Sequence, residues 1–328
     1  MAEEKATSSK KPEGKIGTLA VFFRKIKEIR REKWGDVSGY LFVFPLLAMW
    51  LVFNAYPYLR GIIIPFQNFT WLNPKSWSPL NSFNGLDNFI ELIKDPWVHS
   101  GAKNAFFLWL SWFPFTFCLS IFTAATLAKI RGNKISAAYR VIITLPWVIP
   151  MAAAMPMWGQ IYEPEFGYLR HLLSNVLKVW PNPPVWTVDK FWFWPALGIA
   201  CSWKGFGYYM LMFLLGFYNI PEELYEAARL DGANVWQEFR HISLPGIRNI
   251  LFLFVVTNVG FIGGGMIEMM IFGSGPGGQF QTLNLYAFNQ AFSVDWRLGY
   301  GSAIMFFTGV VNLIVISLVF KFFKIEKA

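Results

Sequence analysis

Residues 226–245 read EAARLDGANVWQEFRHISLP, and this charged stretch lies between two long apolar segments of the chain. A charged side chain at the centre of a bilayer costs several kcal/mol, so the stretch is expected outside the lipid. Gly232 suits the position after a helix end, where a positive φ is favourable, and Asn234 can cap a second helix that Pro245 ends. With Pro221 in the first turn of the first helix, the stretch predicts two short helices joined by a turn on the membrane surface.

Composition places the rest of the chain in a membrane. Apolar residues make up 55% of its 328 residues and charged residues 15%, whereas soluble domains have about 25% charged residues. The net charge of +9 is concentrated near the N-terminus and in short loops, which is typical of membrane orientation rather than of nucleic-acid binding. The two cysteines and three histidines lack the spacing of a metal site or a disulfide framework.

Six segments have the roughly 20 apolar residues that a membrane-spanning helix needs. They cover residues 40–64, 105–128, 141–161, 191–218, 247–272 and 300–323. Pro146, Pro150 and Pro156 predict a kinked helix in the third segment. The expected fold class is therefore an all-α integral membrane protein with six transmembrane helices.

Basic residues in the short loops predict the orientation of these helices. The loop between the second and third segments contains Lys129, Arg131, Lys134 and Arg140 and no acidic residue. Further Lys and Arg residues precede the first segment and follow the sixth. We therefore expect both termini, and residues 221–245 with them, on the cytoplasmic side of the membrane.

The chain before the first apolar segment is expected to form two parts. Residues 1–14 are polar and rich in Lys, Glu and Ser, which is typical of a disordered tail. Residues 15–37 repeat apolar side chains at helical spacing among Arg and Lys, which predicts an amphipathic helix on the inner leaflet. Residues 38–328 are then expected to form one transmembrane domain.

The charged stretch resembles the EAA loop in the membrane-spanning subunits of bacterial ATP-binding-cassette importers. The family pattern of Glu-Ala-Ala, Asp-Gly-Ala, an aromatic residue, an Ile and Leu-Pro is filled here by Glu226, Ala227, Ala228, Asp231, Gly232, Ala233, Phe239, Ile242, Leu244 and Pro245. Similar matches occur just before the loop and at residues 273–278 and 286–292. The resemblance covers the chain from about residue 40 onward. It is greatest for the carbohydrate-uptake branch, which includes maltose-type and oligosaccharide permeases.

The resemblance implies a type I importer permease in the bacterial inner membrane. Residues 221–245 would be its coupling loop. The partners implied are a second, related permease subunit in a heterodimer, two ATP-binding-cassette ATPase subunits, an extracytoplasmic solute-binding protein, a carbohydrate substrate and the lipid bilayer. The sequence lacks the G-x-x-x-x-G-K-[ST] loop that binds nucleotide phosphates. No cofactor is therefore expected in this chain, and ATP and Mg²⁺ belong to the ATPase partners.

The resemblance also implies substrate contacts on the fourth and fifth segments. Counting without gaps from the motif, the maltose-type sugar contacts correspond to Gly205, Tyr208, Asn258, Phe261 and Gly265, together with Cys201 and Ile262. Cys201, Ile262 and Gly265 replace amide side chains of the maltose-type pattern, so the polar contacts must differ. Helix packing is the alternative role for the aromatic and glycine residues.

Two ionisable residues within the predicted spans are functional candidates in their own right. Charged side chains are expensive inside a membrane and are usually retained for a function. Lys204 and Glu268 are such residues, and Lys204 could pair with an acidic substrate or with Glu268 itself.

The expected function is ATP-driven import of a carbohydrate by alternating access. An oligosaccharide is the first choice, with a uronate such as alginate as one candidate, and a glycerol-phosphate or monosaccharide importer is an alternative. An ATP-independent secondary transporter or channel predicts repeated halves, which the sequence does not show. A membrane scaffold, or a loop that only packs on its own helices, would leave the coupling motif without a role.

Overall fold

The computed structural model describes residues 39–323 except 79–81, 131–133, 260–263, 267, 269–271 and 294. Within these residues all regular structure is helical, and β-type pairing is limited to an isolated bridge between Gln67 and Phe83. The predictions for residues 1–37, and those for Phe261 and Ile262, lie outside the described residues. The chain forms two compact units, residues 1–62 and residues 63–328.

One long apolar helical stretch begins in the first unit and ends a few residues into the second. It runs over Gly39–Phe66, which is 28 residues with a mean hydropathy of 1.6, and it includes a π-helical turn η1 (Leu51–Ala55) and α2 (Tyr56–Ile63). This length exceeds the roughly 20 residues that cross a bilayer. The first predicted span is therefore confirmed as a candidate span.

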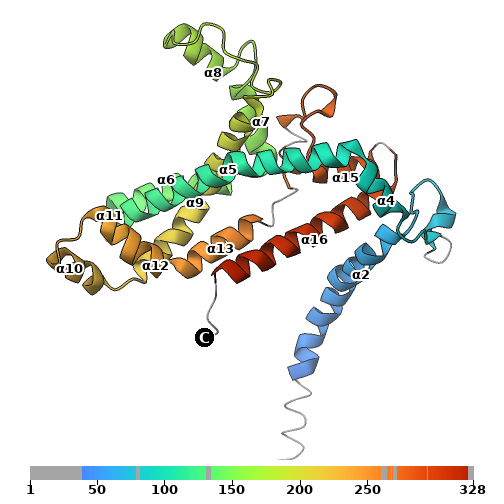
Figure 1. Ribbon diagram of the computed structural model, residues 1–328, viewed down its shortest axis with the longest axis horizontal. Helices are drawn as coiled ribbons and strands as arrows, with labels where there is room; N and C mark the ends of the chain where they lie inside the picture. Colours follow the sequence, from blue (N-terminus) through green and yellow to red (C-terminus); the bar gives the residue numbers. More distant parts are fainter. Residues whose placement is uncertain are drawn as a thin grey trace, which may run out of the picture. The chain divides into compact units, whose positions relative to one another are not determined.

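The second unit contains the remaining helices, shown in Figure 1. In chain order they are η2 (Ile64–Phe66), η3 (Pro74–Trp77), α4 (Asp87–Lys94), α5 (Pro96–Lys129), α6 (Lys134–Val148), α7 (Met151–Ile161), α8 (Tyr168–His171), η4 (Leu172–Val176), α9 (Phe193–Tyr218), α10 (Glu222–Leu230), α11 (Val235–Glu238), η5 (Phe239–Ser243), α12 (Leu244–Gly246), α13 (Arg248–Val259), η6 (Pro276–Gly278), α15 (Leu283–Phe292) and α16 (Leu298–Phe323).

The central contact of this unit is between α5 and α9, which lie side by side (Figure 1). A Cβ atom at Gly198 would lie 2.6 Å from the carbonyl oxygen of Ser111, so the two backbones approach closely. Hydroxyl groups bond across the contact: Thr116 Oγ1 lies 3.1 Å from Ser202 Oγ, and Ser120 Oγ donates to the Phe206 carbonyl at 2.8 Å. Small residues and interhelical hydroxyl bonds are the usual means of helix association in membranes.

The membrane-spanning helices match the prediction of six spans only in part. Among the described residues, three helices are long and apolar enough to cross a membrane: Gly39–Phe66, Pro96–Lys129 and Leu298–Phe323. The number rises to five if each of two bent helix pairs is one span. α9 has 26 residues but falls short in hydropathy, because its Trp, Tyr and Gly residues and Lys204 dilute its aliphatic side chains.

The kink predicted for the third span is confirmed, although only one proline causes it. α6 and α7 meet at 95° across Ile149 and Pro150. Pro146 and Pro156 lie inside α6 and α7 without ending either helix.

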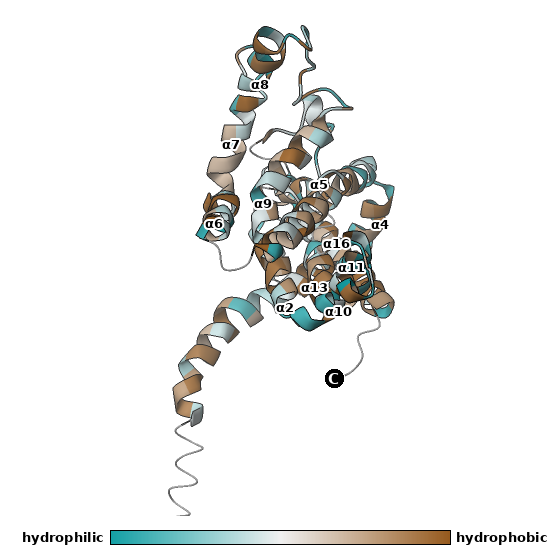
Figure 2. Cartoon of the chain, turned by 90° about the vertical axis from the view of Figure 1, so that its left-hand side faces the viewer, coloured by the Kyte–Doolittle hydropathy of each residue, from teal (hydrophilic) through white to brown (hydrophobic). Residues whose placement is uncertain are grey.

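The hydropathy colouring in Figure 2 places hydrophilic residues along α10, on the segment that the sequence predicts outside the lipid.

Asp95 joins the start of α5 to α15 and α16. Its Oδ1 accepts a hydrogen bond from the Trp97 backbone N–H at 2.8 Å, and its Oδ2 accepts from the hydroxyls of Tyr286 and Tyr300, both at 2.6 Å. Burial raises the pKa of the Asp95 carboxyl, but the hydrogen bonds from the two tyrosines and from the backbone N–H groups of Trp97 and Val98 together outweigh it, and the pKa lies below its ordinary value of 3.8.

Replacing Asp95 by alanine is therefore expected to destabilise the protein at neutral pH by about 3 kcal/mol, through loss of the helix cap and of two charged hydrogen bonds. Because the folded-state pKa is lowered, this contribution is complete above pH 3.8 and is lost as the pH falls below that value. Melting of the detergent-solubilised protein across this range measures the effect. Asp87→Ala, in the first turn of α4, is the control, and an equal loss in both variants would contradict the prediction.

Candidate functional site

The surface loop, residues 221–245, begins with a helix whose end is built around glycine. α10 ends at Leu230, and Gly232 follows with φ +81°. The Ala233 N–H donates to the Ala228 carbonyl at 2.9 Å, and the Gly232 N–H donates to the Arg229 carbonyl at 3.1 Å. These two bonds form a Schellman motif, in which the positive φ favours glycine. The predicted role of Gly232 as the residue after the helix end is confirmed.

A capping box starts the second helix of the surface loop. The Asn234 side chain accepts from the Gln237 N–H at 2.9 Å, and the Gln237 side chain accepts from the Asn234 N–H at 2.8 Å. Helical turns then continue through η5 and α12 as far as Gly246. The prediction that Pro245 ends the second helix of the surface loop is therefore wrong, because the helical turns include Pro245. Pro245 lies in α12, which directly follows a π-helical turn, and the helix ends one residue after it, at Gly246.

Side-chain contacts hold the two helices of the surface loop together. Arg229 Nε lies 3.1 Å from Glu238 Oε1, and the hydroxyls of Tyr225 and Ser243 lie 2.9 Å apart. Phe239 and Leu244 pack against the buried cluster that contains residues of α5, α9 and α13. The surface loop is thus a preformed element, and Phe239 and Leu244 attach it to the helix bundle by packing against this cluster.

Most of the other predicted loop residues are exposed. Glu226, Ala227, Asp231, Gly232 and Pro245 are exposed, whereas Ala228 and Ala233 are half-buried. The structure adds an exposed apolar surface that the motif does not include. It consists of Leu224, Leu230, Val235 and Trp236, with Leu230 exposed to 89%. Apolar residues at exposed positions of a polar loop are the sequence signal that could have identified it.

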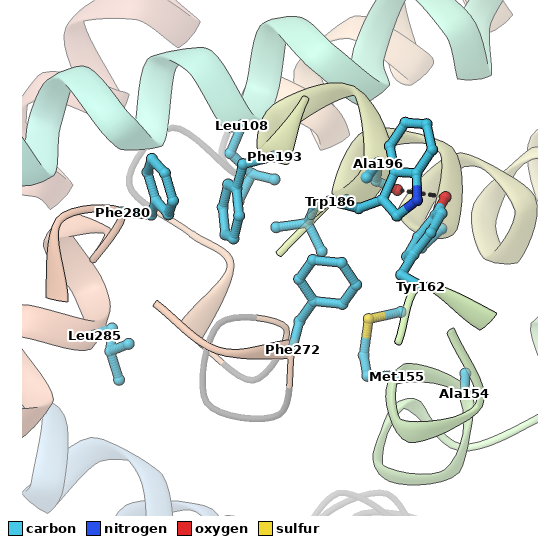
Figure 3. Close-up of a cluster of buried hydrophobic side chains, with 12 residues drawn as sticks. Leu108, Ala154, Met155, Tyr162, Trp186, Phe193, Ala196, Phe272, Phe280 and Leu285 are labelled. Carbon is cyan, nitrogen blue, oxygen red and sulfur yellow. Dashed lines mark hydrogen bonds between the residues drawn. The ribbon is translucent and has the colours of Figure 1, made fainter. Parts of the chain in front are cut away.

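The second candidate site is a cavity of about 100 Å³ between α5, α6, α7 and α9, with Gly264, Gly265 and Glu268 also in its wall. Its lining is rich in aromatic rings and contains one residue of each charge sign: Leu108, Trp109, Trp112, Trp147, Met151, Cys201, Lys204, Gly205, Tyr209, Gly264, Gly265 and Glu268. Leu108 also belongs to the buried cluster in Figure 3. There the rings of Phe193 and Phe280 stack at 4.0 Å, and the Tyr162 hydroxyl donates to the Ala196 carbonyl at 3.0 Å.

The structure brings five of the residues considered for substrate contact together at this cavity: Cys201, Lys204, Gly205, Gly265 and Glu268. Gly265 has φ +82°, and a Cβ there would lie 2.2 Å from Leu108 Cδ2, so a larger residue would displace the wall. Groups of three or more His, Cys, Asp or Glu that could hold a metal ion are absent from the part of the chain described.

Two other predicted residues are not among the cavity lining. Tyr208 stacks on Trp147 at a centroid distance of 4.5 Å, and the neighbouring Tyr209 lines the cavity in its place. Asn258 is fully buried, and its Nδ2 donates to the Phe254 carbonyl at 2.6 Å within its own helix. Of the positions counted from the motif, Gly205 and Gly265 therefore line the cavity, whereas Tyr208 and Asn258 do not.

Comparison with known proteins gives one family and several relatives. Residues 116–324 match the family model described as binding-protein-dependent transport system inner membrane component. The arabinooligosaccharides transport system permease protein AraP of Bacillus subtilis is 32% identical, covering 88% of this chain and 90% of its own. The trehalose/maltose transport system permease protein MalF of Thermococcus litoralis is 27% identical, covering 85% and 92%.

A solved structure shares the fold. A chain of a bacterial ABC transporter involved in the import of the acidic polysaccharide alginate superimposes with a TM-score of 0.77. The two chains are 22% identical, and the match covers 93% of this chain and all of the other.

Proposed function

The chain belongs to the family of binding-protein-dependent transport system inner membrane components, and on this premise we propose that it imports an oligosaccharide. As a permease subunit it provides the pathway through the membrane, while separate ATPase subunits supply the energy. The names of two relatives, for arabinooligosaccharides and for trehalose and maltose, support this substrate class. A uronate such as alginate is an alternative within the class.

The cavity is the observation that carries the choice of a carbohydrate. Rings of Trp109, Trp112, Trp147 and Tyr209 can contact the apolar faces of sugar rings, and Glu268 can accept hydrogen bonds from sugar hydroxyls. Ligand pockets usually measure about 300–1,000 Å³. The cavity of about 100 Å³ would therefore have to widen before a sugar ring could enter.

The finer topology and assembly belong to the same proposal. Six spans would place residues 221–245 and both termini in the cytoplasm, with residues 1–14 as a tail and residues 15–37 as an amphipathic helix before the permease domain, residues 38–328. The partners would be a second permease subunit in a heterodimer, two ATPase subunits that hold ATP and Mg²⁺, and an extracytoplasmic binding protein. No cofactor would reside in this chain.

Reconstitution tests this function directly. The complete complex is placed in liposomes with its binding protein, and uptake of labelled oligosaccharides is followed. Uptake is expected to require both internal ATP and the binding protein. Uptake that proceeds without ATP under an ion gradient would instead establish the secondary transporter, and uptake of glycerol-phosphate or a monosaccharide alone would replace the substrate class.

Leu230 tests the docking role of the surface loop. Leu230→Asp places a charge in the exposed apolar surface, where a partner would have to desolvate it. We expect the ATPase subunits to copurify at least about tenfold less, as for loss of a buried contact of about 1.4 kcal/mol. Phe166→Asp is the matched control, because Phe166 is equally exposed, at 87%, in the loop after α7. Unchanged copurification of Leu230→Asp, or an equal loss in both variants, would remove Leu230 from the docking surface.

A further inference from the structure

The break between α6 and α7 leaves a backbone carbonyl without its helical partner. In an unbroken helix the Trp147 carbonyl would accept from the N–H of Met151, four residues later. The chain instead turns at Pro150, with φ −56° and ψ 144°, before α7 begins. Inside a membrane such a carbonyl requires another donor.

Lys204 of α9 provides that donor. Its Nζ lies 3.1 Å from the Trp147 carbonyl oxygen and 5.3 Å from the centroid of the Trp147 ring. The side chain is only 8% exposed, and a cation is favourable at the C-terminal end of a helix, where carbonyl groups carry partial negative charge. Glu268 lines the same cavity, but among the described residues no carboxylate lies within 4.0 Å of the Lys204 ammonium.

Tyr208 contacts the other part of Trp147. It lies one helical turn after Lys204 on α9, and its ring stacks on the Trp147 ring at 4.5 Å with an angle of 19° between the planes. Lys204 and Tyr208 therefore hold the carbonyl and the ring of one residue, at the last turn before the break. We call Lys204, Tyr208 and Trp147 the Trp147 clamp.

We propose that the Trp147 clamp keeps the α6–α7 span bent and keeps the cavity closed where α6 and α7 line it, so that a ligand enters only when the clamp opens. Trp147 and Met151 line the cavity from the two sides of the break. A change in the bend therefore moves two parts of the wall. Lys204 acts through the Trp147 carbonyl as a positioning residue. The consequence for ligand entry rests on the proposed import function, but the clamp itself does not.

Cys201 provides a readout that requires no substrate. It lines the cavity on α9, three residues before Lys204. We measure the rate at which N-ethylmaleimide modifies Cys201 in the complete, nucleotide-free complex, by mass spectrometry of the peptide that contains it. Lys204→Met and Tyr208→Ala should each raise this rate about tenfold, the order expected when one hydrogen bond to a charged group or an equivalent contact is lost.

Two variants control for general loosening. Tyr208→Phe keeps the stacked ring and should leave the rate within about twofold, because the ring contact, not the hydroxyl, holds Trp147. Arg248→Met removes another cation from a helix-end carbonyl, that of Phe323, and should also leave the rate unchanged. Loss of the Lys204 cation by itself lowers thiol reactivity, so a rise in rate reports opening.

The outcomes separate the clamp from the transport function. An unchanged rate in Lys204→Met and Tyr208→Ala would overturn the clamp, and so would an equal rise in Arg248→Met. If Lys204→Met fails to assemble, Tyr208→Ala against Tyr208→Phe decides the question. Oligosaccharide uptake by the wild-type complex tests the import function independently, so either idea can fail while the other stands.

Discussion

Gly232→Val is expected to abolish the coupling of ATP hydrolysis to substrate in the reconstituted complex. Gly232 has φ +81°, a conformation that costs a β-branched residue on the order of 1–3 kcal/mol. No atom lies within 4 Å of a Cβ at this position, so the penalty comes from the backbone alone. Relieving it breaks the Schellman motif and moves Val235 and Trp236 relative to Leu224 and Leu230 of α10. Substrate-stimulated ATP hydrolysis should fall at least about tenfold.

Two further glycine variants show whether the backbone of the surface loop is responsible. Gly232→Asn should retain most of the activity, because asparagine adopts positive φ more readily than other non-glycine residues. Gly85→Val imposes the same strain, at φ +64° and in equally open space, in the turn before α4, and should leave the stimulation intact. Normal stimulation in Gly232→Val would show that the turn does not position the coupling surface.

The surface loop could be predicted in detail because local chemistry determines it. Gly232 and Asn234 fit their backbone positions without reference to the rest of the fold, and the structure contains the turn and the cap that they predict. The predicted helix end at Pro245 is wrong, because the backbone before Pro245 is not an ordinary α-helix. It forms a π-helical turn, and the helix continues through Pro245.

Several residues singled out in the sequence line the cavity, but the sequence does not determine which of two adjacent tyrosines on α9 does so, because tertiary packing determines which side of a helix faces the cavity. On α9, Tyr209 faces the cavity and Tyr208 faces Trp147. Both are tyrosines in an almost uniformly apolar helix, so periodicity does not distinguish them. The sequence does not predict the partner of Lys204 either. That partner is the Trp147 carbonyl, which is free only because α6 and α7 bend by 95°.

Gly207→Ala is expected to destabilise the protein by forcing α6 and α9 apart. A Cβ at Gly207 would lie 2.2 Å from the carbonyl oxygen of Ile143 and 2.9 Å from Thr144 Cα. Both are backbone atoms, so no side-chain rotation relieves the clash, and α6 would have to move away from α9. Overpacking of this kind costs about 1–3 kcal/mol, which corresponds to an apparent melting temperature lower by roughly 2–12 °C.

Gly205→Ala is the matched control for this effect, two residues earlier on α9. The nearest atom to a Cβ at Gly205 is Tyr209 Cε2 at 3.8 Å, an ordinary contact, so the melting temperature should be unchanged. The same methyl group thus tests two different surfaces of one helix. At Gly207 it meets the α6 backbone, and at Gly205 it enters the cavity, where it can alter substrate uptake without altering the fold. Equal melting temperatures for the two variants would mean that α6 does not pack against α9 as closely as these distances require.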